Sequence, residues 1–426
     1  MRNLMYGVPI LAATLAACSG GANDTAAPSI SAADSEPIAT LDESSSSAAE
    51  PDPAAAQDAS GIAAPSIQIG ELSLTWKAQE IGEGIKPSFA IDEDGVAHVA
   101  FLTEADHGGL FYAQNREGGF EVETVAEGYF YGPIDLALDP SGKPIIAYHD
   151  HQALQFDPAL GDEVIAELTE SGWQLTTVAD DGHDGWDNSI AVDEAGNWHT
   201  AAVDPSQFGS EDGVEYATVI DGAVSVVPVG SGPIKYEFAT SIQLDSSGSP
   251  AIAYYNDRDQ QLELTSLGTS GWTVEVVDDQ GDAGRYASLA YEAGGEPHIA
   301  YYVAEGSESG TVRHAWKDAS GWQIEDVGIL QNLRMGHTGA RKITSLAFDP
   351  EGGLHLAYSD RVRLIYAQRT DDGWIGQEVL EPGSHELGQL VELAIDEDGN
   401  PHLIWFDAIS LSPALQGEVF YAAGSK

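Results

Sequence analysis

A short phrase recurs seven times along this chain, and it constrains the fold more than any other feature. Each copy starts with a small or acidic residue, which is followed by an apolar residue, usually an Ala, another apolar residue and an acid. A turn with Gly and a second apolar run come next. The first copy begins at Ser88 and the last at Glu392. The acids of the turns are Asp92, Asp139, Asp193, Asp245, Glu292, Asp349 and Asp396. A carboxylate at this place can accept hydrogen bonds from backbone N–H groups of its own turn.

Successive turn acids lie 47 to 57 residues apart, and every copy has the chemistry of β-strands. A period near fifty residues with several short strands per copy is typical of a β-propeller. We therefore predict an all-β fold, a seven-bladed β-propeller over residues 71–426. In the fifth copy the expected strands, A to D, cover residues 288–292, 298–302, 312–315 and 322–327, with alternating or β-branched residues.

The seventh copy ends before its fourth strand, and a matching phrase stands at the start of the repeats, over residues 76–81. This N-terminal strand is expected to close the last blade, since an open ring would expose two sheet edges. Closure of this kind makes residues 71–426 one domain that grows by adding blades.

The N-terminus resembles a bacterial lipoprotein signal. Arg2 precedes a short apolar stretch that ends in Leu15-Ala16-Ala17-Cys18, and Cys18 is the only cysteine. Residues 1–18 are read as this signal peptide, with an ordinary secretory signal as the alternative. The resemblance implies lipidation of Cys18, including palmitate, and a lipid anchor in the cell envelope. Ser19 favours the outer membrane of a Gram-negative bacterium. Residues 19–70, rich in Ala, Pro, Ser and acids, are expected to form a disordered tether.

The chain is strongly acidic, with 17 Lys and Arg against 69 Asp and Glu, for a formal charge of −52. Nucleic acid is excluded as a partner on this ground, because phosphate contacts need the opposite sign. Two interpretations of the acids remain open, solvation in a salty habitat and binding of a cation such as calcium. No other cofactor is expected.

Residues that differ between copies are the better guide to a ligand site. Propellers place their D–A and B–C loops on one face, and here those loops hold aromatic and cationic residues in a chain poor in cations. Arg suits a carboxylate or sulfate, Tyr and His suit proton transfer, and Trp suits stacking. The candidate ligand-binding residues are His149, His151, Trp186, Tyr236, Arg285, Tyr286, Arg334, His337 and Arg341.

Two columns of the repeat attract attention as metal sites, and both have a structural interpretation. Five copies begin strand B with His, a pattern better explained by packing than by a ring of ligands. Strand B ends in Asp or Asn in five copies, where the side chain can cap its own hairpin. The weak metal candidates in that column are Asp150, Asp204, Asp360 and Asp407.

The whole phrase, with L-x-Y-A and G-W-x-x-E-x-V, resembles the sialidase-like (BNR-type) repeats of bacterial surface propellers. The Arg-Ile-Pro motif and the S-x-D-x-G-x-x-W box of sialidases are absent, so the resemblance implies the fold and no particular reaction. The sequence favours a lipid-anchored module that binds a surface glycan or an envelope protein. The alternative is a polysaccharide-degrading enzyme, a lyase or glycoside hydrolase, that uses the same face.

Overall fold

The computed structural model describes residues 67–103, 108–128, 130–150, 161–179, 185–204, 213–220, 222–230, 240–306, 309–331, 342–360, 362–380, 387–410 and 416–426. They belong to a compact unit that spans Ala55–Lys426. Strands and turns make up this described part of the chain. It contains no helix that is long and apolar enough to cross a membrane.

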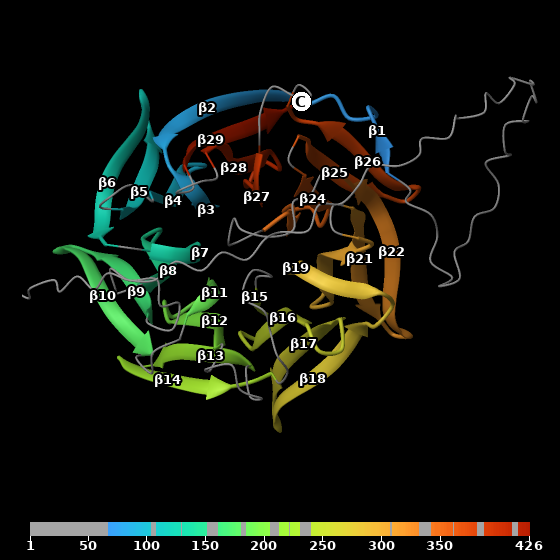
Figure 1. The fold of residues 1–426 in the computed structure, drawn as a ribbon, viewed down its shortest axis with the longest axis horizontal. Coiled ribbons are helices and arrows are strands. Elements are labelled where there is room, and N and C mark those ends of the chain that lie inside the picture. The colour runs from blue at the N-terminus through green and yellow to red at the C-terminus, as the bar shows by residue number, and fades with distance from the viewer. Residues whose placement is uncertain are drawn as a thin grey trace, which may run out of the picture. The chain divides into compact units, whose positions relative to one another are not determined.

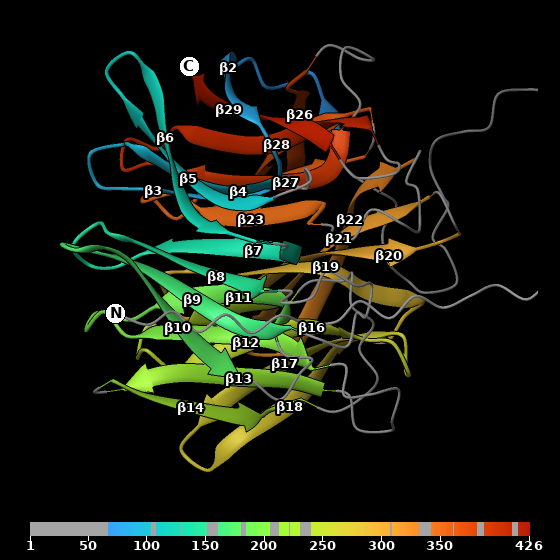
Figure 2. The ribbon, with the colours of Figure 1, turned by 60° about the vertical axis from the view of Figure 1, so that its left-hand side comes forward.

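The strands form six four-stranded sheets and one five-stranded sheet, arranged as a ring of blades (Figures 1 and 2). The predicted seven-bladed β-propeller is therefore confirmed. Strand A of each blade lies nearest the axis of the ring and strand D lies outermost. From A to D the blades are β3 (Ile85–Ile91), β4 (Ala97–Thr103), β5 (Gly109–Arg116), β6 (Gly119–Glu127); β7 (Phe130–Leu138), β8 (Pro144–Asp150), β9 (Asp162–Thr169), β10 (Gly172–Ala179); β11 (Trp186–Val192), β12 (Trp198–Asp204), β13 (Gly213–Ile220), β14 (Ala223–Pro228); β15 (Ser241–Leu244), β16 (Pro250–Asn256), β17 (Gln261–Gly268), β18 (Gly271–Asp278); β19 (Asp282–Tyr291), β20 (Pro297–Ala304), β21 (Gly310–Asp318), β22 (Gly321–Leu330); β23 (Thr344–Phe348), β24 (Leu354–Ser359), β25 (Leu364–Thr370), β26 (Gly373–Glu378); and β27 (Leu387–Ile395), β28 (Pro401–Ser410), β29 (Gln416–Ser425), β2 (Thr75–Glu83).

The last blade takes its outer strand from the N-terminal side of the chain, as the repeat predicted. Strand β2 pairs antiparallel with β29 in a register that sets Gln79 opposite Tyr421. The fifth strand of the sixth blade was not expected. It is β1 (Gln68–Ile69), which pairs parallel with β26 and so begins the ordered strands before residue 71.

The turns between strands A and B explain why the phrase contains Asp and Gly. Each turn glycine has a positive φ, from 76° at Gly95 to 94° at Gly295, a conformation that side chains disfavour. The Asp92 Oδ1 atom accepts hydrogen bonds from the backbone N–H groups of Asp94 (3.0 Å) and Val96 (2.8 Å). Equivalent bonds are made by Asp139, Asp193, Asp245 and Asp349. The predicted role of these acids in capping the turn is confirmed.

A closed circle of hydrogen bonds joins the blades near the axis. In each blade the acceptor is the side chain of the first residue of the phrase. The donor is the backbone N–H of the second residue of the phrase in the next blade, at 2.9 to 3.1 Å. Five of the seven acceptors are serines, and two are carboxylates, so this column demands an acceptor rather than a particular residue. The donor and acceptor pairs are Leu136 to Ser88, Ile190 to Asp135, Ile242 to Ser189, Leu289 to Ser241, Leu346 to Ser288, Leu393 to Ser345 and Phe89 to Glu392.

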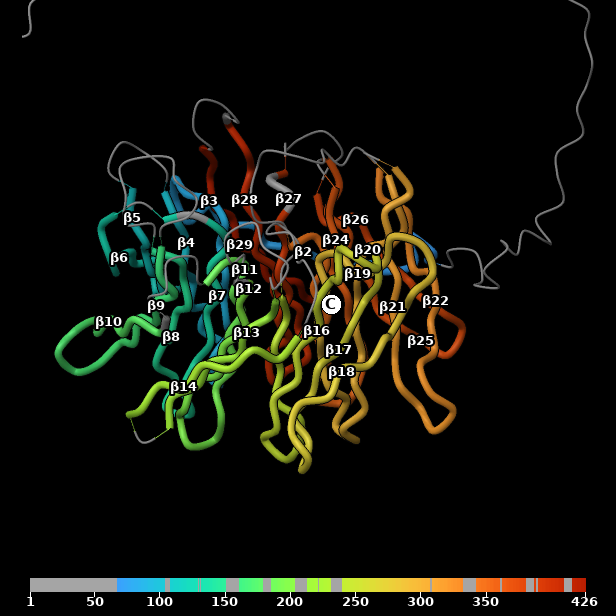
Figure 3. The backbone as a smooth tube through the Cα atoms, turned by 60° about the horizontal axis from the view of Figure 1, so that its bottom comes forward, coloured from blue at the N-terminus to red at the C-terminus, as the bar shows by residue number. Residues whose placement is uncertain are grey.

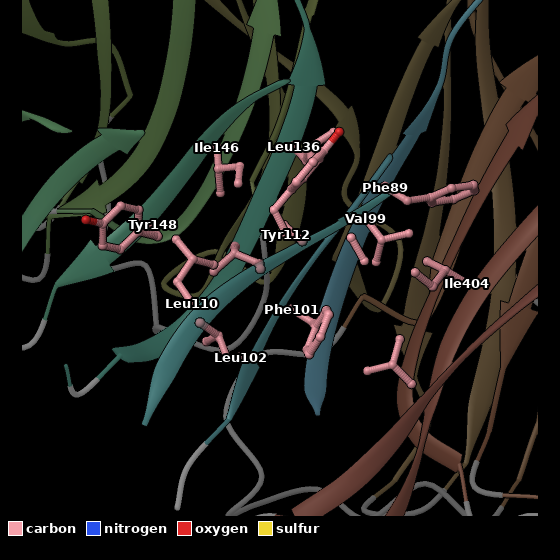
Figure 4. Close-up of a cluster of buried hydrophobic side chains, with 14 of the residues drawn as sticks. Phe89, Val99, Phe101, Leu102, Leu110, Tyr112, Leu136, Ile146, Tyr148 and Ile404 are labelled. Carbon is pink, nitrogen blue, oxygen red and sulfur yellow. The ribbon is translucent and has the colours of Figure 1, made fainter. Parts of the chain in front are cut away.

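The hydrophobic core consists of layers between neighbouring blades rather than one centre. Figure 4 shows one layer, in which Phe89 and Val99 of the first blade lie near Leu136 of the second and Ile404 of the last. Strands β4 and β8 are buried over most of their length because both of their faces lie against apolar neighbours. The sheets are thereby held at fixed positions around the axis, and with them the strand ends that bear the site.

Candidate functional site

The candidate ligand residues were predicted on one face, and the strand directions place them there. Strands A and C begin, and strands B and D end, at the same face, which we call the D–A/B–C face. Figure 3 shows the strands running between the two faces of the ring. His149 is the last residue but one of β8, Trp186 begins β11, and Arg285 and Tyr286 lie near the start of β19. His151, Tyr236, Arg334, His337 and Arg341 lie outside the described residues, as does Cys18.

His149 and Trp186 come together from adjacent blades. Their ring centroids lie 4.9 Å apart with an interplanar angle of 37°, and both side chains are buried. Gly161, just before β9, permits this position, because a Cβ there would collide with the imidazole ring. The sequence placed these two residues on one face, and the structure adds that they form a direct aromatic contact.

Arg285 lies in the fifth blade, and its positive charge is already paired with the Asp282 carboxylate. Its Nε donates to Asp282 Oδ1 at 3.1 Å, and its guanidinium carbon lies 5.3 Å from the centre of the Tyr255 ring. Burial opposes the charged form, yet the Asp282 carboxylate keeps the pKa of Arg285 above its ordinary value. In this structure Arg285 serves an ion pair and a cation–π contact.

Tyr286 belongs to a set of three strained residues that the sequence did not reveal. Lys86, Asp187 and Tyr286 have φ values of 50°, 50° and 57°, in the left-handed region that few residues other than Gly adopt. Each stands two residues before the first residue of its phrase, in the first, third and fifth blades. The A–B pairing shifts register at each of these points.

These three side chains are polar, and all are buried. A bulge with strained backbone redirects side chains and persists only where the surrounding structure enforces it. Its recurrence sets Lys86, Asp187 and Tyr286, which we call the strained layer, at one position of three blades close to the D–A/B–C face. The Tyr286 ring packs in the core between the fifth and sixth blades, with its centroid 6.1 Å from that of Tyr302. Non-glycine residues in this conformation leave no mark in the sequence, which is why the layer was not predicted.

The loop before β23 holds three predicted ligand residues, Arg334, His337 and Arg341, and Lys342, which follows them in the chain, has another role. Lys342 Nζ lies 2.7 Å from Glu392 Oε1 and 3.5 Å from Asp135 Oδ1, the two carboxylates of the hydrogen-bonded circle. Burial disfavours the ammonium, but the two carboxylates outweigh it and raise the pKa of Lys342. The pKa of Glu392 is also raised, chiefly by burial. Lys342 thus neutralises acids of the fold.

A second buried ion network near this face links the fourth and fifth blades. Arg313 donates from Nη1 to Asp278 Oδ2 at 2.9 Å and from Nε to Asp326 Oδ1 at 2.8 Å. The hydroxyl of Tyr301 donates to the same Asp278 oxygen at 2.7 Å. With both carboxylates and a tyrosine engaged, Arg313 stabilises the junction between blades.

The Asp column at the ends of the B strands acts as a set of caps where its contacts are resolved. Asp360 Oδ1 accepts the backbone N–H groups of Val362 and Arg363, and Oδ2 accepts the Arg363 guanidinium. Asn256 caps its own turn in the same way. Asp150 is the last residue of β8, and Asp407 lies within β28. The side chain of Asp204 is outside the described set. No group of three His, Cys, Asp or Glu residues suited to a metal occurs in the described part of the chain.

The histidine column is structural, as predicted. In the first blade His98 lies between Asp92 (Nε2 to Oδ2, 3.1 Å) and Tyr112 (Nδ1 to the hydroxyl, 2.6 Å). Similar Asp–His–Tyr chains occur at His199, His355 and His402. The fifth blade replaces the tyrosine with His314, whose Nε2 lies 3.0 Å from His298 Nδ1. The two blades without the histidine have apolar residues at both positions, Ile145 with Ile165 and Ala251 with Leu264.

Comparison with solved structures agrees with the fold. A polysaccharide lyase, an ulvan lyase, superposes with a TM-score of 0.54 at 14% identity over 81% of this chain and 95% of that chain. The ulvan lyase bound to -[GlcA(1-4)Rha3S]- gives 0.52 at 13% identity over the same shares. A lectin of Aleuria aurantia gives 0.46 at 12% identity over 71% of this chain and 98% of that chain. Identities this low show a common fold alone. No family model and no curated protein sequence matches the chain.

Proposed function

We propose that this propeller binds a glycan at its D–A/B–C face. The observation that carries the proposal is the strained layer of Lys86, Asp187 and Tyr286, repeated at one position of three blades. Such strain costs of order 1–3 kcal/mol per residue, and it clusters where a site has to be pre-organised. The ligand would lie over this layer, near the axis, where loops of several blades meet.

The chemistry of the surrounding residues fits a sugar ligand. Aromatic rings, acids and cations meet at the same ends of the strands, among them Trp186, Arg285 and Asp282. Glycan sites combine aromatic surfaces with a few placed polar groups. The likeness to an ulvan lyase, whose structure holds -[GlcA(1-4)Rha3S]-, supports a polysaccharide as the class of ligand. An envelope protein is the other partner that the acidic surface and the tether allow.

Degradation of the glycan is the alternative function, and buried polar residues close to the same face favour it. His149, Lys86 and Tyr286 are proton-transfer groups buried beneath one face, and catalytic acids and bases are often set in such surroundings. A polysaccharide lyase or glycoside hydrolase would use groups of this kind. Binding comes first here because the sequence carries no recognisable catalytic acid–base motif.

We further propose that the propeller is held at the cell envelope, in the outer membrane, by lipid on Cys18. The lipobox resemblance supports this, as does the run of 52 residues from 19 to 70 without Lys or Arg. The part of this run that precedes β1, residues 19–66, would span roughly 40 Å root-mean-square as a flexible chain, at about 5–6 Å times the square root of its residue number. Such a tether would let the ring reach surface polysaccharide.

A glycan array with residues 55–426, the compact unit, tests the proposal. Every glycan that binds is then incubated with the protein and examined for shortened chains. Binding without shortening supports the binding module, and shortening supports the enzyme. Absence of binding across neutral and anionic polysaccharides would overturn both.

Glycine variants connect the result to the site. Lys86→Gly and Asp187→Gly accept the left-handed backbone without strain, so folding should be retained while binding falls. Gln260→Gly is the matched control, because Gln260 has a φ of 56° in an exposed turn outside the layer. Equal binding by all three variants would show that the layer has no part in recognition.

A further inference from the structure

Strand β14 differs from every other outer strand of the ring. All six of its residues, Ala223–Pro228, are exposed, and none is charged. Val224, Val226 and Val227 expose 36–37% of their surface. In a chain with 86 charged residues an uncharged, exposed strand of this kind is unusual, and it has the composition of an interface.

The other blades show what this position normally holds. Where β14 has Val227, the other outer strands have polar residues: Glu123, Thr176, Glu275, Glu325, Gln377 and Gln79. Two of those carboxylates accept the indole N–H of the next blade, Glu123 from Trp173 at 3.0 Å and Glu325 from Trp374 at 2.9 Å. The third blade has replaced both the acid and the aromatic residue of this pattern with valine.

The outer edge of β14 is also open. Strand β14 pairs with β13 on its inner side, and no strand of the described chain pairs with its other side. The corresponding edge of the sixth blade is covered by β1 of the same chain. The neighbouring outer strand β10 has no charged residue either, and it lies beside β14 in the ring (Figure 1).

We propose that β14 pairs with β14 of a second copy of this chain, antiparallel and across a two-fold axis. An identical strand is self-complementary in this arrangement, and it would join two four-stranded blades into one eight-stranded sheet. Two copies of charge −52 repel each other over most approaches. They meet with least repulsion where neither carries charge, and there the valines of the two strands would face one another.

Sedimentation of residues 55–426 over two decades of protein concentration tests this proposal. We expect a monomer–dimer equilibrium in which added NaCl favours the dimer, because salt screens the repulsion between the copies. Val226→Glu should shift the equilibrium to monomer, since the two new carboxylates would lie near the axis. Val274→Glu is the matched control, because Val274 has the equivalent exposed place on β18 and should leave the dimer intact.

Each other result overturns the proposal. A wild-type protein that stays monomeric at the highest concentration and salt has no such interface. A dimer that survives Val226→Glu uses another surface. Equal loss of the dimer in both variants would mean that added charge, and not this edge, controls association. A melting curve of each variant confirms that it is folded before these outcomes are compared.

Discussion

Glu392 of the last blade accepts the backbone N–H of Phe89 in the first blade at 3.0 Å, where most blades use a serine. This bond completes the circle around the axis at the junction between the two ends of the repeat series. A carboxylate at this place also needs a counter-charge, and Lys342 supplies it from the sixth blade. One side chain therefore ties three blades together.

Removal of that side chain should cost more than removal of a serine in the same circle. Glu392→Ala breaks the bond to Phe89 and removes the nearer of the two carboxylates beside Lys342, whose side chain is 23% exposed, so that the more distant Asp135 remains. We expect a loss of about 2 kcal/mol or more in the free energy of unfolding. Ser345→Ala loses one neutral acceptor and should cost about 1 kcal/mol. Equal losses by chemical denaturation would contradict the role given to Lys342.

Truncation from the N-terminus should distinguish the contribution of β1 to stability from that of β2. A fragment that starts at residue 71 lacks β1 and should melt within a few degrees of residues 55–426. A fragment that starts at residue 83 loses almost all of β2, opens two sheet edges, and should aggregate or melt lower by more than about 10 °C. Melting of the shorter fragment at the parental temperature would refute closure by β2.

The buried histidines predict a stability that falls in acid. Burial lowers the pKa of His98, His199, His314 and His355, and that of His298 to about 3. Their unfolded pKa is about 6.5, so below that pH the unfolded chain binds more protons than the folded one. This contribution is complete above about pH 6.5 and is lost progressively as the pH falls towards the folded pKa values.

Denaturant unfolding at about pH 7.5 and about pH 5 should show a loss of about 2 kcal/mol or more. The double variant His298→Ile with His314→Ile copies the apolar pair of the second blade, Ile145 and Ile165. It should reduce the dependence on pH while the fold persists. An unchanged slope would show that this pair does not titrate on unfolding.

Arg334 and Arg341 remain cations for which a ligand role is predicted from the sequence. A charge-assisted bond to Arg contributes about 1.5–3 kcal/mol, so Arg341→Ala should weaken glycan binding roughly tenfold to a hundredfold. Stability should change little. Arg369→Ala is the control, because Arg369 pairs with Glu325 and stacks on Trp316 near the other face. A loss of affinity in Arg369→Ala but not in Arg341→Ala would show that the site lies on the other face of the ring.

Lipidation predicts a simple fractionation result. Cys18→Ser removes the thiol that takes the lipid, so the protein should leave the membrane fraction while its melting temperature stays the same. Continued membrane association of a folded variant would point to another anchor.

The sequence predicted the blades, their order and their closure because each rests on a residue pattern repeated seven times. It also predicted that Asp92 and His98 serve the fold, since their equivalents recur. The first position of the phrase never holds an apolar residue, a sign of the hydrogen-bonded circle that becomes clear only with the blades in place.

What the sequence missed depends on contacts between distant residues or on backbone conformation. Lys342 meets Asp135 from 207 positions away, and no local pattern marks that pairing. Lys86 and Asp187 adopt a glycine-like φ without being glycine. Strand β1 is two residues long and pairs with a blade other than the one closed by the next strand. Among the predicted ligand residues that the structure describes, His149 and Trp186 lie in direct contact.

The position of β1 has a mechanical consequence. A pull along the chain that precedes Ile67 is applied first to β1 on the sixth blade and only afterwards to β2, the strand that closes the ring. Ile67 and Ile69 fit against Gly376, where a larger residue would leave no room for them. A force on the preceding chain would therefore have to separate this short strand from the sixth blade before it acted on β2. In this way β1 protects the closure of the ring from such a force.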